Sequence, residues 1–139
     1  DIMVLRVDAS FSFANAEYFK DFILEKSERE GREVEVVVVD GSSINDLDTT
    51  AIEALFSVVE SLEEMGIELH ITGLIGPVRE VVRRSGLYGV LGPDHFHLDP
   101  HEAVVSIFGQ WDAQDEGDRV ERYFATTEPE RKESTPAAS

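Results

Sequence analysis

The fold is decided by residues 36–56, which read VVVVDGSSINDLDTTAIEALF. Four consecutive valines predict a strand that is buried on both faces. A short polar loop follows the strand, and Asp48 stands where the cap of a helix is expected. Apolar residues then recur at helical spacing and predict a helix that packs one face on the sheet: Ile52, Leu55, Phe56, Val59 and Leu62.

Two hydroxyl side chains, Thr49 and Thr50, lie in the first turn of this predicted helix. The backbone N–H groups of a first turn have no partner within the helix, and the helix dipole favours negative charge there. We therefore expect this helix start to accommodate a small anion, a phosphate ester or a partner's carboxylate. The alternative is that Asp48 caps the helix and the two threonines only complete its first turn.

The elements on either side alternate between strand and helix. Strands are predicted at residues 2–8, 33–40, 67–72 and 95–98, extended chain at 10–14, and helices at 15–29, 49–65, 76–85 and 100–111. This order predicts one α/β domain over residues 1–111, built as an open sheet with helices against it. Residues 112–139 are predicted to form an acidic C-terminal extension, helical at 112–125 and disordered from about residue 126.

Charge and composition exclude several classes of function. The chain has 29 acidic and 12 basic residues and a net charge of −17, which argues against nucleic-acid binding and against anionic lipid surfaces. It contains no cysteine, so disulfides, thiolate metal sites and cysteine nucleophiles are excluded. No apolar run approaches the roughly 20 residues that span a bilayer, and we expect a soluble domain.

Catalytic and metal-binding patterns find little support. Ser42 and Ser43 lack a Gly-x-Ser-x-Gly elbow, and no pair of carboxylates is distinguished by its spacing, so we expect no enzyme. His95, His97 and His101 fall within seven residues, but a strand followed by a helix start does not make all three converge. We therefore expect a solvated edge strand and no metal. A receiver domain is rejected because it requires acidic and lysine residues that this chain lacks at the corresponding places.

The strand and helix order, together with two short motifs, resembles the STAS domain, a family named for sulfate transporters and anti-sigma-factor antagonists. One motif is the turn Asp48-Thr49-Thr50-Ala51 after the valine strand. The other is the block SFANAEYF at residues 12–19, which is similar to the SulP transporter branch. The resemblance covers residues 2–111 and implies a STAS-like open mixed sheet of about four to five strands, with helices mainly on one face.

The transporter branch implies a non-catalytic regulatory domain on the cytoplasmic face of the cell membrane. Such a domain acts in the assembly, trafficking or regulation of a SulP-type transporter of sulfate, bicarbonate or another anion. The transmembrane domain, expected before Asp1, is then the main partner, with another cytosolic protein as a further one, and the transporter is expected to be a homodimer. Arg79, Arg83 and Arg84 form a candidate docking patch for acidic loops or lipid headgroups. Alternatively, Arg83 and Arg84 complement the negative end of their own helix.

The antagonist branch implies a different function. In those soluble proteins, a serine directly after the aspartate is phosphorylated by a partner kinase, which makes Thr49 the candidate phosphoacceptor and Thr50 the second. This chain departs from that pattern at Thr49 and at Ala51, where antagonists usually have serine and glycine. These departures favour the transporter branch.

The resemblance also directs attention to the loops that follow the strands. Nucleotide binding there would need a phosphate-binding motif that ends in Lys-Ser or Lys-Thr, which is absent, and the acidic surface opposes a triphosphate. We therefore expect no cofactor, and nucleotide only as a minor alternative. The candidate residues for an anion, a nucleotide or a partner are Ser42, Ser43, Asp48, Thr49, Gly73 and Gly76.

Overall fold

We describe the protein from a computed structural model, which defines residues 2–7, 21–22, 25, 34–111 and 120–125. Its strands are β1 (Ile2–Val7), β2 (Val36–Asp40), β3 (Glu68–Thr72), β4 (Phe96–His97) and β5 (Val120–Ala125). Its helices are α2 (Thr49–Glu64), α3 (Gly76–Ser85), α4 (Leu87–Leu91) and α5 (Pro100–Trp111), with a 3₁₀ turn η1 (Pro93–His95) before β4. The expected extended chain at 10–14 lies outside the described residues. Most of the helix expected at 15–29 and all of residues 126–139 also lie outside the described residues.

The five strands form one sheet in the order β4-β3-β2-β1-β5. Every neighbouring pair is parallel, with Val4 opposite Val38 and Val38 opposite His70 in the central register. The expected number of strands is confirmed, but the expectation of a mixed sheet was wrong for the described strands. Antiparallel neighbours can be joined by short hairpins, whereas parallel strands need longer crossover connections. In the described part of the chain, α2 connects β2 to β3, and α3 and α4 lie between β3 and β4.

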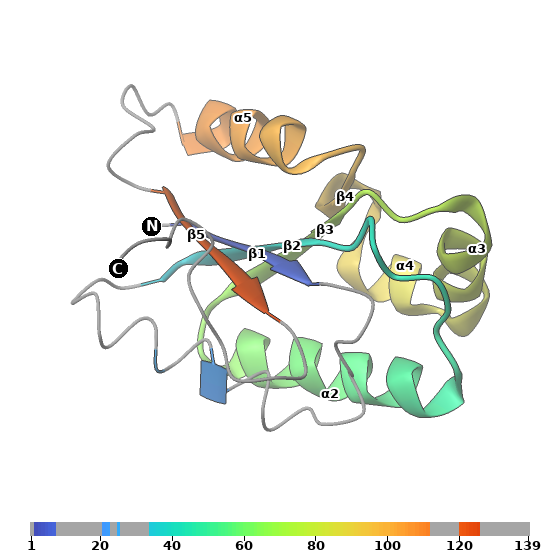
Figure 1. The fold of residues 1–139 in the computed structure, drawn as a ribbon. Coiled ribbons are helices and arrows are strands. Elements are labelled where there is room, and N and C mark those ends of the chain that lie inside the picture. The colour runs from blue at the N-terminus through green and yellow to red at the C-terminus, as the bar shows by residue number, and fades with distance from the viewer. Residues whose placement is uncertain (1, 8–20, 23–24, 26–33, 112–119, 126–139) are drawn as a thin grey trace, which may run out of the picture.

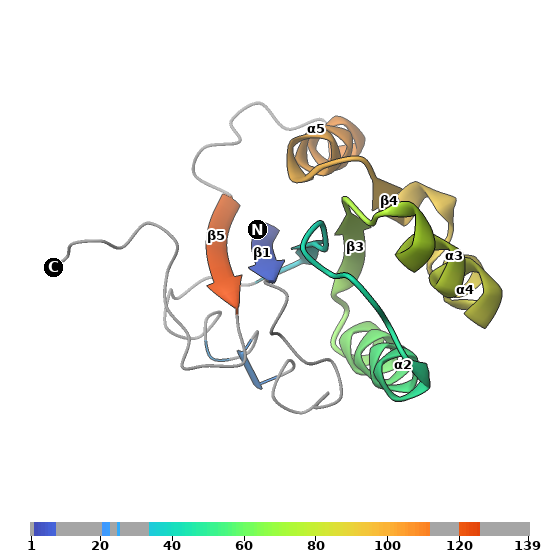
Figure 2. The same ribbon diagram turned by 45° about the vertical axis from the view of Figure 1, so that its right-hand side comes forward.

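Helices cover both faces of the sheet, as Figures 1 and 2 show, with α2, α3 and α4 on one side and α5 on the other. Side chains of a strand alternate between the two faces, so β1 contributes Met3, Leu5 and Val7 to the larger core under α2 to α4. Ile2 and Val4 contribute to the smaller core under α5. The prediction of helices mainly on one face is therefore confirmed, with α5 as the exception.

The all-valine strand is buried as predicted. The four valines of β2 are between 0 and 3% exposed. Strands β1 and β3 flank β2, and helices cover both of its faces, so each of its alternating side chains meets a core. This strand is the centre of the domain.

The helix predicted at residues 112–125 was wrong over its last six residues, because Val120–Ala125 is a strand that runs parallel to β1, and residues 112–119 lie outside the described part of the chain. Its register places Tyr123 opposite Leu5. β-Branched and aromatic residues of this segment favour a strand, and the open edge of β1 offers backbone groups to pair with. The sheet therefore extends past the predicted end of the domain at residue 111.

The region between β3 and α5 is more divided than expected. Gly86 ends α3 with a φ of 92°, as the glycine at this position predicted. The chain then enters the short helix α4 directly. The strand expected at residues 95–98 is reduced to Phe96 and His97 by the preceding 3₁₀ turn. Among the described residues, none of the helices combines the length and apolarity needed to cross a membrane.

Removal of core volume from α2 tests this packing. Leu62 is 1% exposed in the larger core, so Leu62→Ala should lower the free energy of unfolding by about 2–5 kcal/mol, from lost burial and the cavity that remains. Glu60→Ala, at an exposed position of the same helix, is the matched control and should change it by less than about 0.5 kcal/mol. Urea unfolding of both variants measures the difference, and equal midpoints would contradict the assigned core.

Candidate functional site

The loops after β2 and β3 meet at the carboxyl edge of the sheet. Asp40 and Thr72 end these strands as register partners, and the Gly41 N–H donates to the Thr72 carbonyl at 2.8 Å. Asp40 Oδ1 accepts from the Ser42 N–H at 3.1 Å. A side chain at Gly73 would place its Cβ 3.1 Å from that of Ser42, and φ of Gly73 is +73°. The structure thus brings the predicted loop residues Ser42 and Gly73 together, and the contact requires glycine.

The start of α2 is capped by its own aspartate. Asp48 Oδ1 accepts from the Ala51 N–H at 2.8 Å, so the predicted cap is confirmed. The carboxylate already occupies part of the positive end of the helix, where an external anion would bind. Thr49 and Thr50 are exposed beside it, as is Ser43 in the preceding loop. The structure therefore supports the capping interpretation, while phosphorylation of Thr49 or Thr50 stays a prediction.

Buried apolar residues anchor the loop between β2 and α2. Ile44 and Leu47 are 8% and 6% exposed and belong to the larger core, while the polar residues between them face solvent. Gly76 begins α3, where a Cβ would meet nothing within 4 Å. The predicted loop residues consequently form a fixed and largely polar surface.

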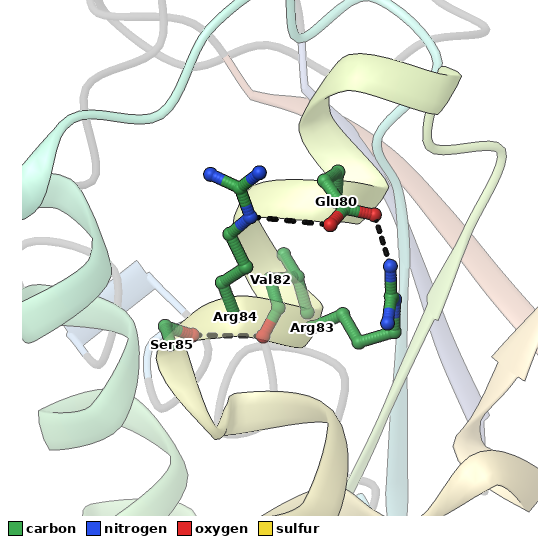
Figure 3. A network of polar contacts seen from close by, with 5 residues as sticks. All are labelled: Glu80, Val82, Arg83, Arg84 and Ser85. Carbon is green, nitrogen blue, oxygen red and sulfur yellow. Dashed lines mark hydrogen bonds and ion pairs between the residues drawn. The ribbon is translucent and has the colours of Figure 1, made fainter.

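The three arginines of α3 have different partners, and Figure 3 shows those of Arg83 and Arg84. Glu80 accepts hydrogen bonds from Arg83 and from Arg84, the latter at 3.2 Å, and these contacts, Arg83 first, lower the pKa of Glu80. Arg79 donates to the Leu74 carbonyl at 3.2 Å. Arg83 and Arg84 lie in the last turn of α3, where they complement the helix dipole, yet their side chains are 62% and 79% exposed. Both sequence interpretations of this patch are therefore compatible with the structure.

A second polar cluster, which the sequence pattern did not reveal as a whole, lies at β3 and β4. His70 is 2% exposed, and its ring centroid lies 4.2 Å from that of His95, on which it stacks, and 5.2 Å from that of His97. His70 Nδ1 lies 2.9 Å from His97 Nε2, and His70 Nε2 lies 3.1 Å from Glu68 Oε1. His101, the third histidine of the sequence cluster, is instead exposed on α5. We call Glu68, His70, His95 and His97 the histidine cluster.

Hydrogen bonding at the edge of β3 explains why the cluster forms. Strand β4 pairs with Ile71 and Thr72 but not with the first half of β3. His95 Nδ1 lies 2.7 Å from the Leu69 carbonyl, and since a carbonyl only accepts, this nitrogen carries the proton. The imidazole thus occupies the place of a missing backbone donor. In the sequence, the only indication of this cluster was that Glu68, His70 and Thr72 alternate along a predicted strand and so share one face.

Burial controls the protonation of the cluster. The pKa of His70 is lowered from 6.5 to about 4, chiefly because burial disfavours the charged ring. The nearby His95 and His97 also lower this pKa, whereas the hydrogen bond to Glu68 raises it. Burial also lowers the pKa of His97. Both rings are therefore neutral at pH 7. Nearby, the Thr72 hydroxyl is fully buried and has no hydrogen-bond partner among the described residues.

The aspartate cap yields one prediction. Asp48→Ala should lower the free energy of unfolding by about 1 kcal/mol, because the Ala51 N–H loses its acceptor. Asp46→Ala, at an exposed position of the same loop, removes an equal charge and should have little effect. Thermal unfolding measures the midpoint temperature of each variant. An equal fall in this temperature for both variants would show that the effect comes from the lost charge and not from the lost cap.

The buried histidine yields a prediction about pH. Well above pH 6.5, His70 is neutral in both states and contributes no pH dependence. As pH falls through 6.5 toward 4, His70 of the unfolded chain binds a proton that the folded state does not bind. Stability should therefore fall between about pH 7 and pH 5, where carboxylates are still ionised. In chelator-treated protein, His70→Gln should flatten this slope and His101→Gln should not reproduce that change. Identical slopes for wild type and His70→Gln would contradict the assignment.

Comparison with known proteins identifies the family. The family model for the STAS domain matches residues 1–103. The chain is similar to a protein named Probable sulfate transporter 3.4 from Arabidopsis thaliana, with 26% identity over 119 residues, 80% of this chain and 18% of that protein. The chain spans less than a fifth of the length of the curated relatives it matches.

Solved structures show the same fold. A sulfate transporter family protein from Wolinella succinogenes aligns with a TM-score of 0.68 and 20% identity, over 81% of this chain and 88% of that one. The STAS domain of a SulP transporter from Vibrio cholerae aligns with a TM-score of 0.66 and 21% identity, over 81% and 85% of the two chains. With the family model matching most of the chain, the protein belongs to the STAS domain family.

Proposed function

We propose that this chain is the cytoplasmic regulatory and interaction domain of a SulP-type anion transporter. One observation carries the proposal: curated relatives named as sulfate transporters match a STAS domain that makes up less than a fifth of their length. The remaining length in those relatives is enough to contain a membrane domain. The domain then acts on assembly, trafficking or regulation of transport, and it performs no catalytic step.

The charge distribution supports a specific docking surface for this function. Arg79, Arg83 and Arg84 lie within two turns of α3 on a chain of net charge −17. Glu80 engages two of the three guanidinium groups but cannot neutralise them all, so the patch keeps a net positive charge. Such a patch is complementary to acidic loops of a transmembrane domain. Those loops are the partner that we propose for α3.

The soluble antagonist function receives less support. The curated relatives are named as probable sulfate transporters, and Asp48 caps α2 beside Thr49. A phosphate on Thr49 would lie close to this carboxylate and be repelled by it. Phosphorylation of Thr49 and homodimer formation stay predictions from the family resemblance.

Charge reversal in the full-length transporter tests the proposal. The variant R79E/R83E/R84E should reduce sulfate uptake or the amount of transporter at the membrane, because the docking surface changes sign. Exposed acids of α2 provide a control of equal charge change in the opposite sense, E53K/E60K/E64K, which should leave both quantities near wild type. Uptake of radiolabelled sulfate and surface immunoblotting measure the two effects.

Two results would count against this function. The first is unchanged uptake and unchanged membrane level for the arginine variant, with the isolated domain still folded by circular dichroism; this would remove α3 as the docking surface. The second is full transport after deletion of the whole domain, which would remove the regulatory role itself. The two outcomes are distinguishable because the deletion does not depend on the choice of α3.

A further inference from the structure

We propose that Glu68, His70 and His95 bind a borderline divalent transition-metal ion, with zinc as the representative. The three residues each offer one ligand atom, and these atoms lie within 4.8 Å of one another. One carboxylate oxygen and two imidazole nitrogens suit zinc-class ions, whereas magnesium and calcium prefer oxygen ligands alone. The site is new relative to the loops and the arginine patch described above.

The fold brings the three ligands together from two segments. Glu68 and His70 alternate on β3, so both side chains lie on the same face of the sheet. His95 reaches them from the 3₁₀ turn η1, because its imidazole binds the Leu69 carbonyl at the unpaired half of β3. His70 and His95 are 25 residues apart in the sequence. The hydrogen bond from His95 to Leu69 and the short pairing of β4 with β3 bring them together.

The nitrogen atoms that would not bind the metal are already held. His95 Nδ1 donates its proton to the Leu69 carbonyl, which leaves Nε2 with a free lone pair. His70 Nδ1 is in contact with His97 Nε2 at 2.9 Å, while its Nε2 faces Glu68. Metal-binding histidines characteristically hold their second nitrogen in this way, which fixes the orientation of the ring. His97 thus serves as a positioning residue for His70.

Only small movements are needed to complete the coordination. Ligands at about 2.0–2.1 Å from a tetrahedral zinc lie roughly 3.4 Å apart. The pair Glu68 Oε1 and His70 Nε2 is already 3.1 Å apart, and the Glu68 side chain is 54% exposed and able to adjust. The His95 ring, stacked at 13° to that of His70, must tilt so that its Nε2 converges on the same point.

Access to the site comes from an adjoining pocket. A pocket of about 330 Å³ is lined by Glu68 and His95 and also by Glu63 from the end of α2. It gives an ion a path from solvent and leaves room for a water molecule as the fourth ligand. The strongly negative chain further raises the local concentration of cations.

Isothermal titration calorimetry of the chelator-treated full chain with ZnCl₂ at neutral pH tests the proposal. We expect saturable binding of one zinc per chain that excess Mg²⁺ does not displace. His95→Ala and Glu68→Gln should each weaken it at least tenfold, since a ligand is lost, and His97→Phe about tenfold through the lost positioning contact. His101→Ala, at the exposed histidine outside the cluster, is the control and should bind as wild type.

Each contrary result overturns the site. The absence of zinc binding by the folded wild-type protein would do so, as would binding that survives both His95→Ala and Glu68→Gln. An equal loss in His101→Ala, or displacement by Mg²⁺, would show that zinc binds the acidic surface in general. Because His70 is buried and its replacement threatens folding, circular dichroism confirms that each tested variant is folded. Because the Glu68 side chain is exposed, Glu68→Gln tests the metal site without disturbing the core.

Discussion

Burial of the valine strand β2 on both faces is the constraint on which the rest of the structure depends. Its four valines can lose contact with water only if helices cover the sheet above and below, and α2 and α5 provide these two layers. The two-sided core also fixes the register, because a shift of one residue would exchange the faces of every side chain. The parallel pairing then places the carboxyl ends of the described strands at one edge of the sheet.

The two polar regions of the domain follow from this register in different ways. At the carboxyl edge, Asp40 and Thr72 are opposite one another, so the loops that begin at Ser42 and Gly73 must meet. At the edge of β3, pairing with β4 is too short to satisfy Leu69, and His95 supplies the missing donor. The histidine cluster is thus a consequence of incomplete strand pairing. The regulatory function and the metal site that we propose use separate surfaces and stand independently.

Local patterns predicted much of this arrangement, because the responsible interactions lie close together in the sequence. The valine run, the Asp48 cap and the Gly86 helix end each depend on a few neighbouring residues, and each was found where expected. The strand Val120–Ala125 was missed because its stability comes from the edge of β1, more than 100 residues away. The parallel direction of the strands was missed because it depends on how the connections cross the sheet.

The candidate site shows the same division. The places of Ser42, Asp48, Thr49 and Gly73 at strand ends and a helix start could be predicted, because these boundaries depend on neighbouring residues, while their role as a binding surface stays a prediction. The partnership of His70 with His95 was not, since it requires the register of β3 against β4 and a 3₁₀ turn that replaces part of the expected strand. Sequence proximity instead suggested His101, which the start of α5 places away from the cluster on an exposed surface.

Amide hydrogen exchange of the native protein, followed residue by residue by NMR, tests the central role of β2 most directly. Amides of a strand at the centre of the core exchange only when the whole domain unfolds, whereas edge and terminal elements open locally. The account predicts that Val37, Val38 and Val39 exchange with the free energy of global unfolding, and that the short edge strand β4 exchanges much faster. Exchange of the β2 valines at the rate of β4 would contradict it.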